Sequence, residues 1–353
     1  MSQNDRPRMS MAEGWDRAPR ALAVIKAIGK TPPTISPRLV KKLTKLLNEL
    51  AIIRKDDPRI IPKLTKRLRA KYTYHTNAIE GNTLTLSETR AFIETGMTIS
   101  GKPLRDFTEA KNIPEALNMV IDMALPDNPL RVSDLLDLHR IVVKDTGEAD
   151  PGYFRKGLVT IGDIKYVPPP AYELERLVDE MITYINKNPD KLNPYELAFK
   201  AHLWLVSIHP FDDGNGRVSR LLAALIQLRQ HMPPIIIKTE HKKRYWSVLR
   251  KTQDKVTLQP YYDFVAEEYI ATLIEYITAA RQAGPEDNLV PLAQAAKKYK
   301  LDAEYLGLLA RTEVINATKI GGRWMVRVKD MEDYMAHGRT PQRKPKRKRA
   351  KAS

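Results

Sequence analysis

Apolar residues recur at helical spacing along most of this chain, and this periodicity limits the fold more than any other feature. Leu and Ile recur among Lys and Arg from Ser36 to Leu68, and the same period is strong in Tyr172–Asn186 and Pro194–Ile208. Such spacing places apolar side chains on one face of an α-helix. Within the first 287 residues, a hairpin pattern occurs only around Gly162 and Asp163. We therefore expect a mainly α fold with one short hairpin there.

The bulk composition favours a folded intracellular protein. Hydrophobic residues make up 42% of the 353 positions, enough to bury a sizeable core. The absence of cysteine excludes disulfides, thiolate metal sites and a cysteine nucleophile, and it fits a reducing compartment. The first residues are polar, and no run reaches the length of a membrane span. We expect a soluble cytoplasmic protein, or a nuclear one in a eukaryote, without a membrane partner.

The net charge of +17 is concentrated towards the C-terminus. Residues 339–353 hold eight Lys or Arg and no acid, and residues 288–338 hold eight basic and six acidic side chains. These two segments carry +10, which leaves +7 for the first 287 residues. A basic tail attracts polyanions, so nucleic acid is an expected partner.

The most informative segment is a short loop, His209 to Gly216, between two apolar helices. Gly214 and Gly216 let backbone N–H groups approach a ligand without a side chain in the way. These groups lie at the start of the next helix, where anions are stabilised. Arg217 and Arg220 lie three residues apart on one face of that helix. The segment therefore predicts an anion site.

Two further side chains add chemistry to this anion site. Asp213 offers one carboxylate for a hard cation such as Mg²⁺, which usually takes one or two carboxylates together with phosphate oxygens. His209 can accept a proton near neutral pH. Together these groups suit in-line attack on a phosphorus atom. Each feature alone is commonly structural, and it is their combination in one short segment that indicates function.

The segment matches every defined position of the HxFx(D/E)GNGRxxR signature, and the chain resembles the Fic (Fido) family. The resemblance extends to LHRIVV, GYFRKG, YVPPP and AHLWLVSIHPF. It implies a helical Fic core and transfer of AMP from ATP, with Mg²⁺ or Mn²⁺, to a Tyr, Thr or Ser hydroxyl of a protein substrate, which can be the chain itself. Two alternatives are a Fic-fold transferase using another nucleotide or phosphate donor, and a DNA-binding regulator with an inactive Fic scaffold.

The resemblance also implies a role for each residue of the loop. His209 is the base that deprotonates the target hydroxyl, and Asp213 holds the metal. The remaining group binds the nucleotide phosphates: Gly214, Asn215, Gly216, Arg217 and Arg220. We interpret Phe211 as the anchor of the loop in the core.

The expected hairpin resembles the flap that holds a target's backbone beside the active site by β-augmentation. On this interpretation its two strands border the target groove, through Val159, Thr160, Ile161, Ile164 and Tyr166. An ordinary surface hairpin is the alternative.

The segment Thr76-x-x-x-Glu80-Gly81 resembles the inhibitory motif of Fic proteins whose inhibitory helix precedes the core. Glu80 at a helix end would pair with Arg220, which the γ-phosphate needs, and would misalign the α-phosphate. A misplacement of about 1 Å can cost on the order of 10²-fold in rate. Glu-Gly before NTLTLSE is also typical of a helix C-cap followed by a new capped helix, and both interpretations can hold. Some relatives use this glutamate to remove AMP, so the reverse reaction is open.

From Val290 the order helix, helix, hairpin, helix resembles an excisionase-type winged helix-turn-helix, with Asp302 as an N-cap. A protein-docking module is the alternative, because the second helix lacks obvious base-reading side chains. The sequence also leaves a homodimer open. The expected parts are an N-terminal helical segment (1–58), an inhibitory helix region (59–125), the Fic core (126–282), a linker (283–288), the winged-helix domain (289–338) and a basic disordered tail (339–353).

Overall fold

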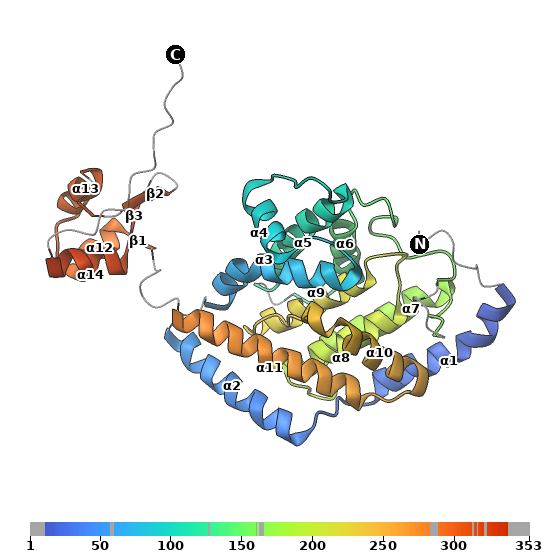
Figure 1. Cartoon of the computed structure of the whole chain (residues 1–353). Coiled ribbons are helices and arrows are strands. Elements are labelled where there is room, and N and C mark those ends of the chain that lie inside the picture. The colour runs from blue at the N-terminus through green and yellow to red at the C-terminus, as the bar shows by residue number, and fades with distance from the viewer. Residues whose placement is uncertain are drawn as a thin grey trace, which may run out of the picture. The chain divides into compact units, whose positions relative to one another are not determined.

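The computed structural model describes residues 11–56, 60–125, 128–159, 161, 166–282, 289–312, 314–315, 317–320 and 323–337. These residues are mainly helical, as the sequence predicts, and the chain divides into two compact units (Figure 1). The first unit runs from Met1 to Ile277 and the second from Thr278 to Ser353. Within the described part of the chain, no helix is both long enough and apolar enough to cross a bilayer.

The first unit is built from helices, and the last of them, α11, continues past Ile277 into the second unit. In chain order they are α1 (Met11–Lys30), α2 (Pro37–Asp56), α3 (Ile60–Glu80), α4 (Leu86–Thr95), α5 (Leu104–Met123), α6 (Val132–Val142), α7 (Leu174–Lys187), α8 (Pro194–Ile208), α9 (Asn215–Arg229), α10 (Lys242–Lys255) and α11 (Gln259–Gln282). Short 3₁₀ turns precede α7 at Ala171–Glu173 and α10 at Thr239–His241.

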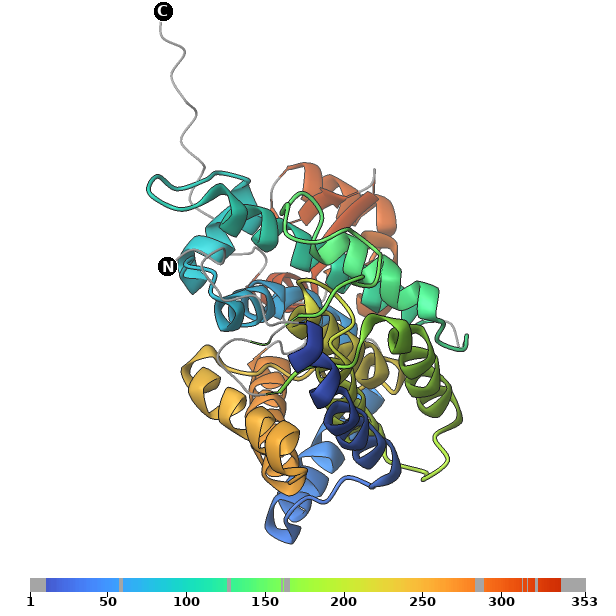
Figure 2. The same cartoon turned by 90° about the vertical axis from the view of Figure 1, so that its right-hand side faces the viewer.

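The centre of this unit is the pair α8 and α9, which Figures 1 and 2 show surrounded by other helices. α8 begins at a capping box between Asn193 and Glu196, with Pro194 at its first position. Nearly every residue of α8 is buried, and so is nearly every residue of α9. A helix buried all round belongs to the interior of a protein. The loop that joins them is therefore fixed between two rigid supports.

The surrounding helices cover this pair on different sides. α3, α5 and α6 pack on α9, whereas α1 and α7 pack on α8. α7 shows the expected amphipathic pattern, because its buried residues recur every three or four positions. They are Leu174, Leu177, Val178, Met181, Ile182 and Ile185.

The inhibitory segment extends α3. The helix expected up to Leu68 continues through the motif that starts at Thr76, and α3 ends at Glu80. Gly81 follows with φ 110°, a conformation that favours glycine, so the C-cap interpretation is confirmed. The predicted new helix also begins as expected, since Thr85 and Glu88 form a capping box at the start of α4.

The second unit combines three helices with a three-stranded sheet. Its elements are β1 (Leu289–Pro291), α12 (Leu292–Tyr299), α13 (Ala303–Arg311), β2 (Ala317–Ile320), β3 (Arg323–Arg327) and α14 (Val328–His337). Asp302 caps α13 as predicted, accepting from the backbone N–H of Tyr305 at 2.8 Å. β2 and β3 pair antiparallel with Ile320 opposite Arg323. β1, which the sequence did not predict, pairs antiparallel on the other side of β3.

Candidate active site

Side chains and backbone together hold the loop between α8 and α9. His209 ends α8 with φ 52°, and Gly214 precedes α9 with φ 80°. The side chain of Asn215 accepts from the backbone N–H of Phe211 (3.0 Å) and donates to its carbonyl (2.8 Å). Phe211 is fully buried, which confirms that it anchors the loop. Asn215, expected to hold phosphate, here uses its amide to brace the loop.

A second histidine, His139 on α6, supports the loop. Its ring stacks on Phe211, with centroids 3.8 Å apart and 6° between the planes. The backbone N–H of Gly152 donates to Nδ1 (3.1 Å), so the proton lies on Nε2, which donates to the carbonyl of Asp213 (3.2 Å). Burial lowers the pKa of His139 to about 4, so the ring is neutral at pH 7. The ring therefore fixes the backbone of the candidate metal ligand.

His209 is placed to act as a base. Its Nδ1 lies 3.4 Å from the carbonyl of Val206, which can only accept, so Nδ1 carries the proton and Nε2 keeps a free lone pair. Desolvation and then the charge of Arg155 lower the pKa of His209 to about 4. The imidazole is therefore neutral and able to take a proton at physiological pH.

The two arginines of the loop signature lie inside the protein. Arg217 and Arg220 are 1% and 2% exposed, which excludes a solvated helix face. Arg217 donates from Nη1 to Glu109 of α5 (2.9 Å) and from Nη2 to Asp213 (2.5 Å). Burial raises the pKa of Asp213, but the charges of Arg217 and Arg105 and the backbone N–H of Gly214 together outweigh it, so the pKa of Asp213 is lowered. Asp213 is thus an ionised carboxylate whose side chain is 31% exposed.

Glu80 reaches the start of α9. Its Oε1 accepts from Arg220 Nη2 at 2.6 Å. The same arginine donates from Nε to Thr76 Oγ1 (2.7 Å) and from Nη2 to the Thr76 carbonyl (2.9 Å). A Cβ added to Gly216 would collide with Glu80 Oε1. The carboxylate therefore lies against the bare backbone of Gly216, where the sequence predicts an anion.

Two buried donors at this place lack partners among the described residues. They are Nη1 of Arg220 and Nε of Arg217. A buried guanidinium N–H without an acceptor is costly, so such donors fit a site that receives an additional anion. Mg²⁺ or Mn²⁺ would be held by Asp213 together with the phosphates, since Mg²⁺ binds to one or two carboxylates and phosphate oxygens. The residues present therefore fit a metal–nucleotide ligand.

The predicted flap is only partly described. Val159 and Ile161 lie in the described chain without a regular strand, whereas Thr160 and Ile164 lie outside the described residues. Tyr166 was predicted to border the target, but the structure buries it. Its side chain is 2% exposed, and its hydroxyl donates to the Ser207 carbonyl at 2.8 Å. A buried phenol needs an acceptor, so Tyr166 fastens this segment to α8 instead.

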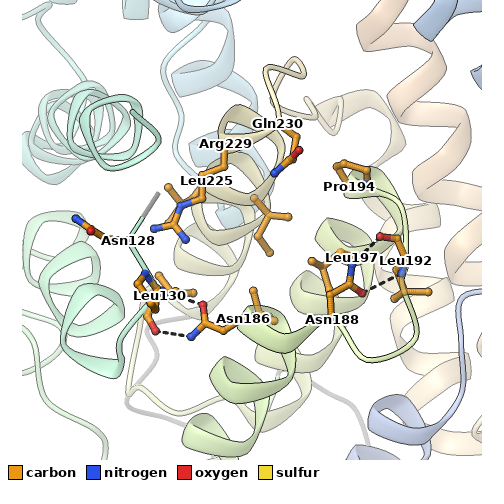
Figure 3. Close-up of a pocket in the computed structure, with 13 residues that line it drawn as sticks. Asn128, Leu130, Asn186, Asn188, Leu192, Pro194, Leu197, Leu225, Arg229 and Gln230 are labelled. Atoms are coloured by element: carbon orange, nitrogen blue, oxygen red, sulfur yellow. Dashed lines mark hydrogen bonds between the residues drawn. The ribbon is translucent and has the colours of Figure 1, made fainter. Parts of the chain in front are cut away.

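A separate pocket of about 460 Å³ lies at the other end of α9 (Figure 3). Asn186 bonds reciprocally to the backbone of Leu130, and Asn188 bonds reciprocally to the backbone of Leu192. These amides close loops at the rim, as the dashed lines in Figure 3 show. The pocket contains none of the residues of the signature segment.

The sequence assigned no role to three residues that shape the site: Glu109, His139 and Arg155. His139 and Arg155 occur in LHRIVV and GYFRKG, so the family resemblance marked their segments but not their contacts. Glu109 gave no signal, because its burial depends on Arg217, which lies 108 positions further along the chain.

Comparisons with known proteins agree with this geometry. The model of the Fic/DOC family matches residues 129–227. Among curated proteins, the chain is 34% identical over 273 residues to protein adenylyltransferase fic-1 of Caenorhabditis briggsae, covering 74% of this chain and 53% of that protein. It is 35% identical over 211 residues to protein adenylyltransferase Fic of Nematostella vectensis, covering 59% and 49%. The chain therefore spans about half the length of the curated relatives it matches.

Solved structures are similar as well. The chain superposes on Fic-1 from C. elegans with a TM-score of 0.60 and 31% identity, covering 70% of this chain and 76% of that one. A Fic domain-containing signaling protein from Bacteroides thetaiotaomicron shares the fold, with a TM-score of 0.61, 24% identity and coverage of 68% and 97%. The signature loop, the helical core around it and this likeness lead to one conclusion: the chain belongs to the Fic family.

Proposed function

We propose that this chain is a protein adenylyltransferase, held inactive by Glu80, that moves AMP from ATP to a Tyr, Thr or Ser hydroxyl of a target protein. The observation that carries the proposal is the anion site at the start of α9. A carboxylate lies there against Gly216 and pairs with Arg220, while buried arginine donors beside it have no hydrogen-bond partner in the described part of the chain. Triphosphate would supply the missing acceptors once Glu80 is displaced.

The reaction follows from the groups around that site. His209 Nε2 takes the proton of the target hydroxyl, and the hydroxyl oxygen attacks the α-phosphorus. The bond between the α-phosphorus and its bridging oxygen breaks, and pyrophosphate leaves with the electron pair. A metal ion held by Asp213 and the phosphates would neutralise charge on the phosphate oxygens. Arg217 and Arg220 provide fixed positive charge in a buried setting, where it is effective.

Inhibition follows from the same contacts. Arg220 serves Glu80 in the resting chain and would serve the γ-phosphate in the active form. Glu80 also brings negative charge to the place where phosphate must lie. ATP can then bind only with its phosphates displaced, and small displacements of the reacting atoms slow transfer strongly.

The C-terminal unit is proposed as a winged helix-turn-helix-like module. Its support is the order of two helices, an antiparallel hairpin and a closing helix. Tyr305 and Leu308 of α13 are exposed apolar residues, and this favours a protein partner as much as a nucleic acid. Because the proposed reaction consumes ATP, we place it in the cytoplasm, or in the nucleus of a eukaryote.

Labelled nucleotides test the proposed function. The Glu80→Gly chain is incubated with Mg²⁺ and either α-labelled ATP or α-labelled UTP, and covalent label is measured together with the intact mass. Label from ATP that disappears in Glu80→Gly/His209→Ala supports AMP transfer. Label from UTP alone indicates another donor, and no label from either, with a cell lysate as acceptor, indicates an inactive scaffold.

A further inference from the structure

The backbone of the catalytic base is in an uncommon conformation. His209 has φ 52° and ψ 58°, in the left-handed region that few residues other than glycine adopt. It also precedes Pro210, and a residue before proline favours extended backbone. Such a conformation persists only when its surroundings over-determine it. Something must therefore hold the peptide groups on either side of His209.

One arginine outside the signature supplies the contacts on the C-terminal side. The backbone N–H of Arg155 donates to the Pro210 carbonyl at 3.0 Å. Its side chain donates from Nε to the His209 carbonyl at 2.8 Å. Arg155 is 2% exposed, so water does not compete strongly for these two carbonyls. The first two carbonyls of the catalytic loop are thus fixed by a single residue.

The same guanidinium reaches backbone on both sides of the predicted flap. Nη1 donates to the Gly157 carbonyl (2.7 Å) and Nη2 to the Pro169 carbonyl (2.5 Å). Gly157 and Pro169 bracket residues 158–168, which contain every residue predicted to border the target. A guanidinium presents its donors in a rigid planar fork, so the three carbonyls are held in a fixed relation. A lysine could not reproduce that relation.

We propose that Arg155 is a positioning residue for AMP transfer, which holds the strained backbone of His209 and joins it to Gly157 and Pro169 on either side of the predicted flap. This inference rests on the proposed function. It goes beyond it, because the hydrogen bonds of Arg155 reach only backbone carbonyls and none of the side chains proposed to bind nucleotide or metal.

Charge provides a second, separable effect. Arg155 lies close enough to His209 to lower its pKa, whereas Glu80 and Asp213 raise it. Removing the Arg155 charge should therefore move the pKa of His209 upward from about 4, towards the ordinary value near 6.5. The pH at which the transfer rate falls on the acid side (the acid limb) would rise together with this pKa, because only neutral imidazole accepts a proton.

The experiment uses the full chain in the Glu80→Gly background. Arg155→Met removes both the planar set of N–H donors and the positive charge. Arg155→Lys keeps the charge but not the planar set of donors. Lys156→Met is the matched control, because Lys156 is the neighbouring cation and is exposed. The rate of self-modification by saturating Mg·ATP is followed by intact mass across the pH range, and ATP affinity is measured separately.

For Arg155→Met we expect a rate loss on the order of 10²-fold with ATP affinity within about threefold of the parent. Its acid limb should move to higher pH. Arg155→Lys should lose rate but keep the acid limb, and Lys156→Met should match the parent. If Arg155→Met does not fold, Arg155→Lys tests the inference by itself: its transfer rate should fall while its ATP affinity stays close to that of the parent.

Two results overturn the inference. In the first, Arg155→Lys transfers AMP as fast as the parent, and the fall of the rate at low pH lies at the same pH in folded Arg155→Met as in the parent. The other is ATP affinity that falls in parallel with rate in both variants, which would make Arg155 a support of the fold in general. Failure of the proposed function looks different, because then the Glu80→Gly parent itself gains no AMP.

Discussion

Glu80→Gly should release the transferase, and the structure sets the size of the effect. Glu80 Oε1 makes one charge-assisted hydrogen bond of 2.6 Å to Arg220 Nη2 and lies against Gly216. Hydrogen bonds to charged groups contribute about 1.5–3 kcal/mol. The Glu80 side chain is 29% exposed, so solvent screening favours the lower half of that range. At about 1.4 kcal/mol per tenfold, the lower half of that range corresponds to a rise in transfer of roughly 10- to 40-fold.

Intact-mass spectrometry of the chain with saturating Mg·ATP measures this increase directly. Glu80→Gln separates charge from size, because glutamine keeps the volume beside Gly216 without the ion pair, and we expect an intermediate rate. Glu94→Gly is the matched control, since Glu94 is an exposed glutamate on α4. Adding Arg220→Ala to Glu80→Gly should abolish the gain, because the γ-phosphate then loses its partner.

One outcome would refute this reasoning about Glu80. If the parent and Glu80→Gly transfer AMP equally fast at saturating ATP and with a known acceptor, Glu80 is only the last residue of a capped helix. A gain of the same size in Glu94→Gly would also refute it, because the effect would then arise from loss of any negative charge.

Three further predictions concern the base, the metal and the second unit. His209→Ala should abolish transfer while nucleotide affinity stays nearly intact, and the rate of the parent should fall only as pH drops towards about 4, where the imidazole becomes protonated. Asp213→Ala should lose most activity and excess chelator should abolish it in the parent; full activity in chelator would contradict a metal role. A chain ending near Asp287 should keep transferase activity. The full chain should bind mixed DNA in a shift assay with a steep salt dependence that flattens when residues 339–353 are removed, and failure to bind at low salt would rule out nucleic acid.

The sequence predicted the centre of the fold well because the relevant signals are local. Apolar periodicity placed α8 from Pro194 to Ile208, as the structure has it. The spacing of Arg217 and Arg220 put both on one face of the following helix, and both point inward. Helix caps were also predictable, as Asp302 shows, since a cap depends on residues only a few positions apart.

Long-range contacts could not be predicted in the same way. Glu109 meets Arg217 from another helix, and no local pattern in α5 distinguishes it from a surface acid. Arg155 binds backbone carbonyls, which every residue carries, so its partners leave no trace in the sequence. Tyr166 was predicted from the family resemblance to border the target, yet its buried hydroxyl needs an acceptor and donates to the Ser207 carbonyl. β1 has only three residues and pairs with a strand more than 30 positions later, so its pattern was too short to recognise.

The contacts around Arg220 bear on how the proposed inhibition by Glu80 would be relieved while α3 stays helical. Thr76 holds Arg220 through its hydroxyl and its carbonyl, and these bonds involve Nε and Nη2. Glu80, at the last position of α3, is followed by Gly81 and accepts one hydrogen bond from Arg220 Nη2. A nucleotide therefore needs to displace one carboxylate, while Thr76 keeps both the arginine and α3 in place. Rotation of one side chain at a helix end is a small rearrangement, so we infer that the resting and active forms share the same α3. A nucleotide-bound structure in which α3 has withdrawn from Arg220 would contradict this inference.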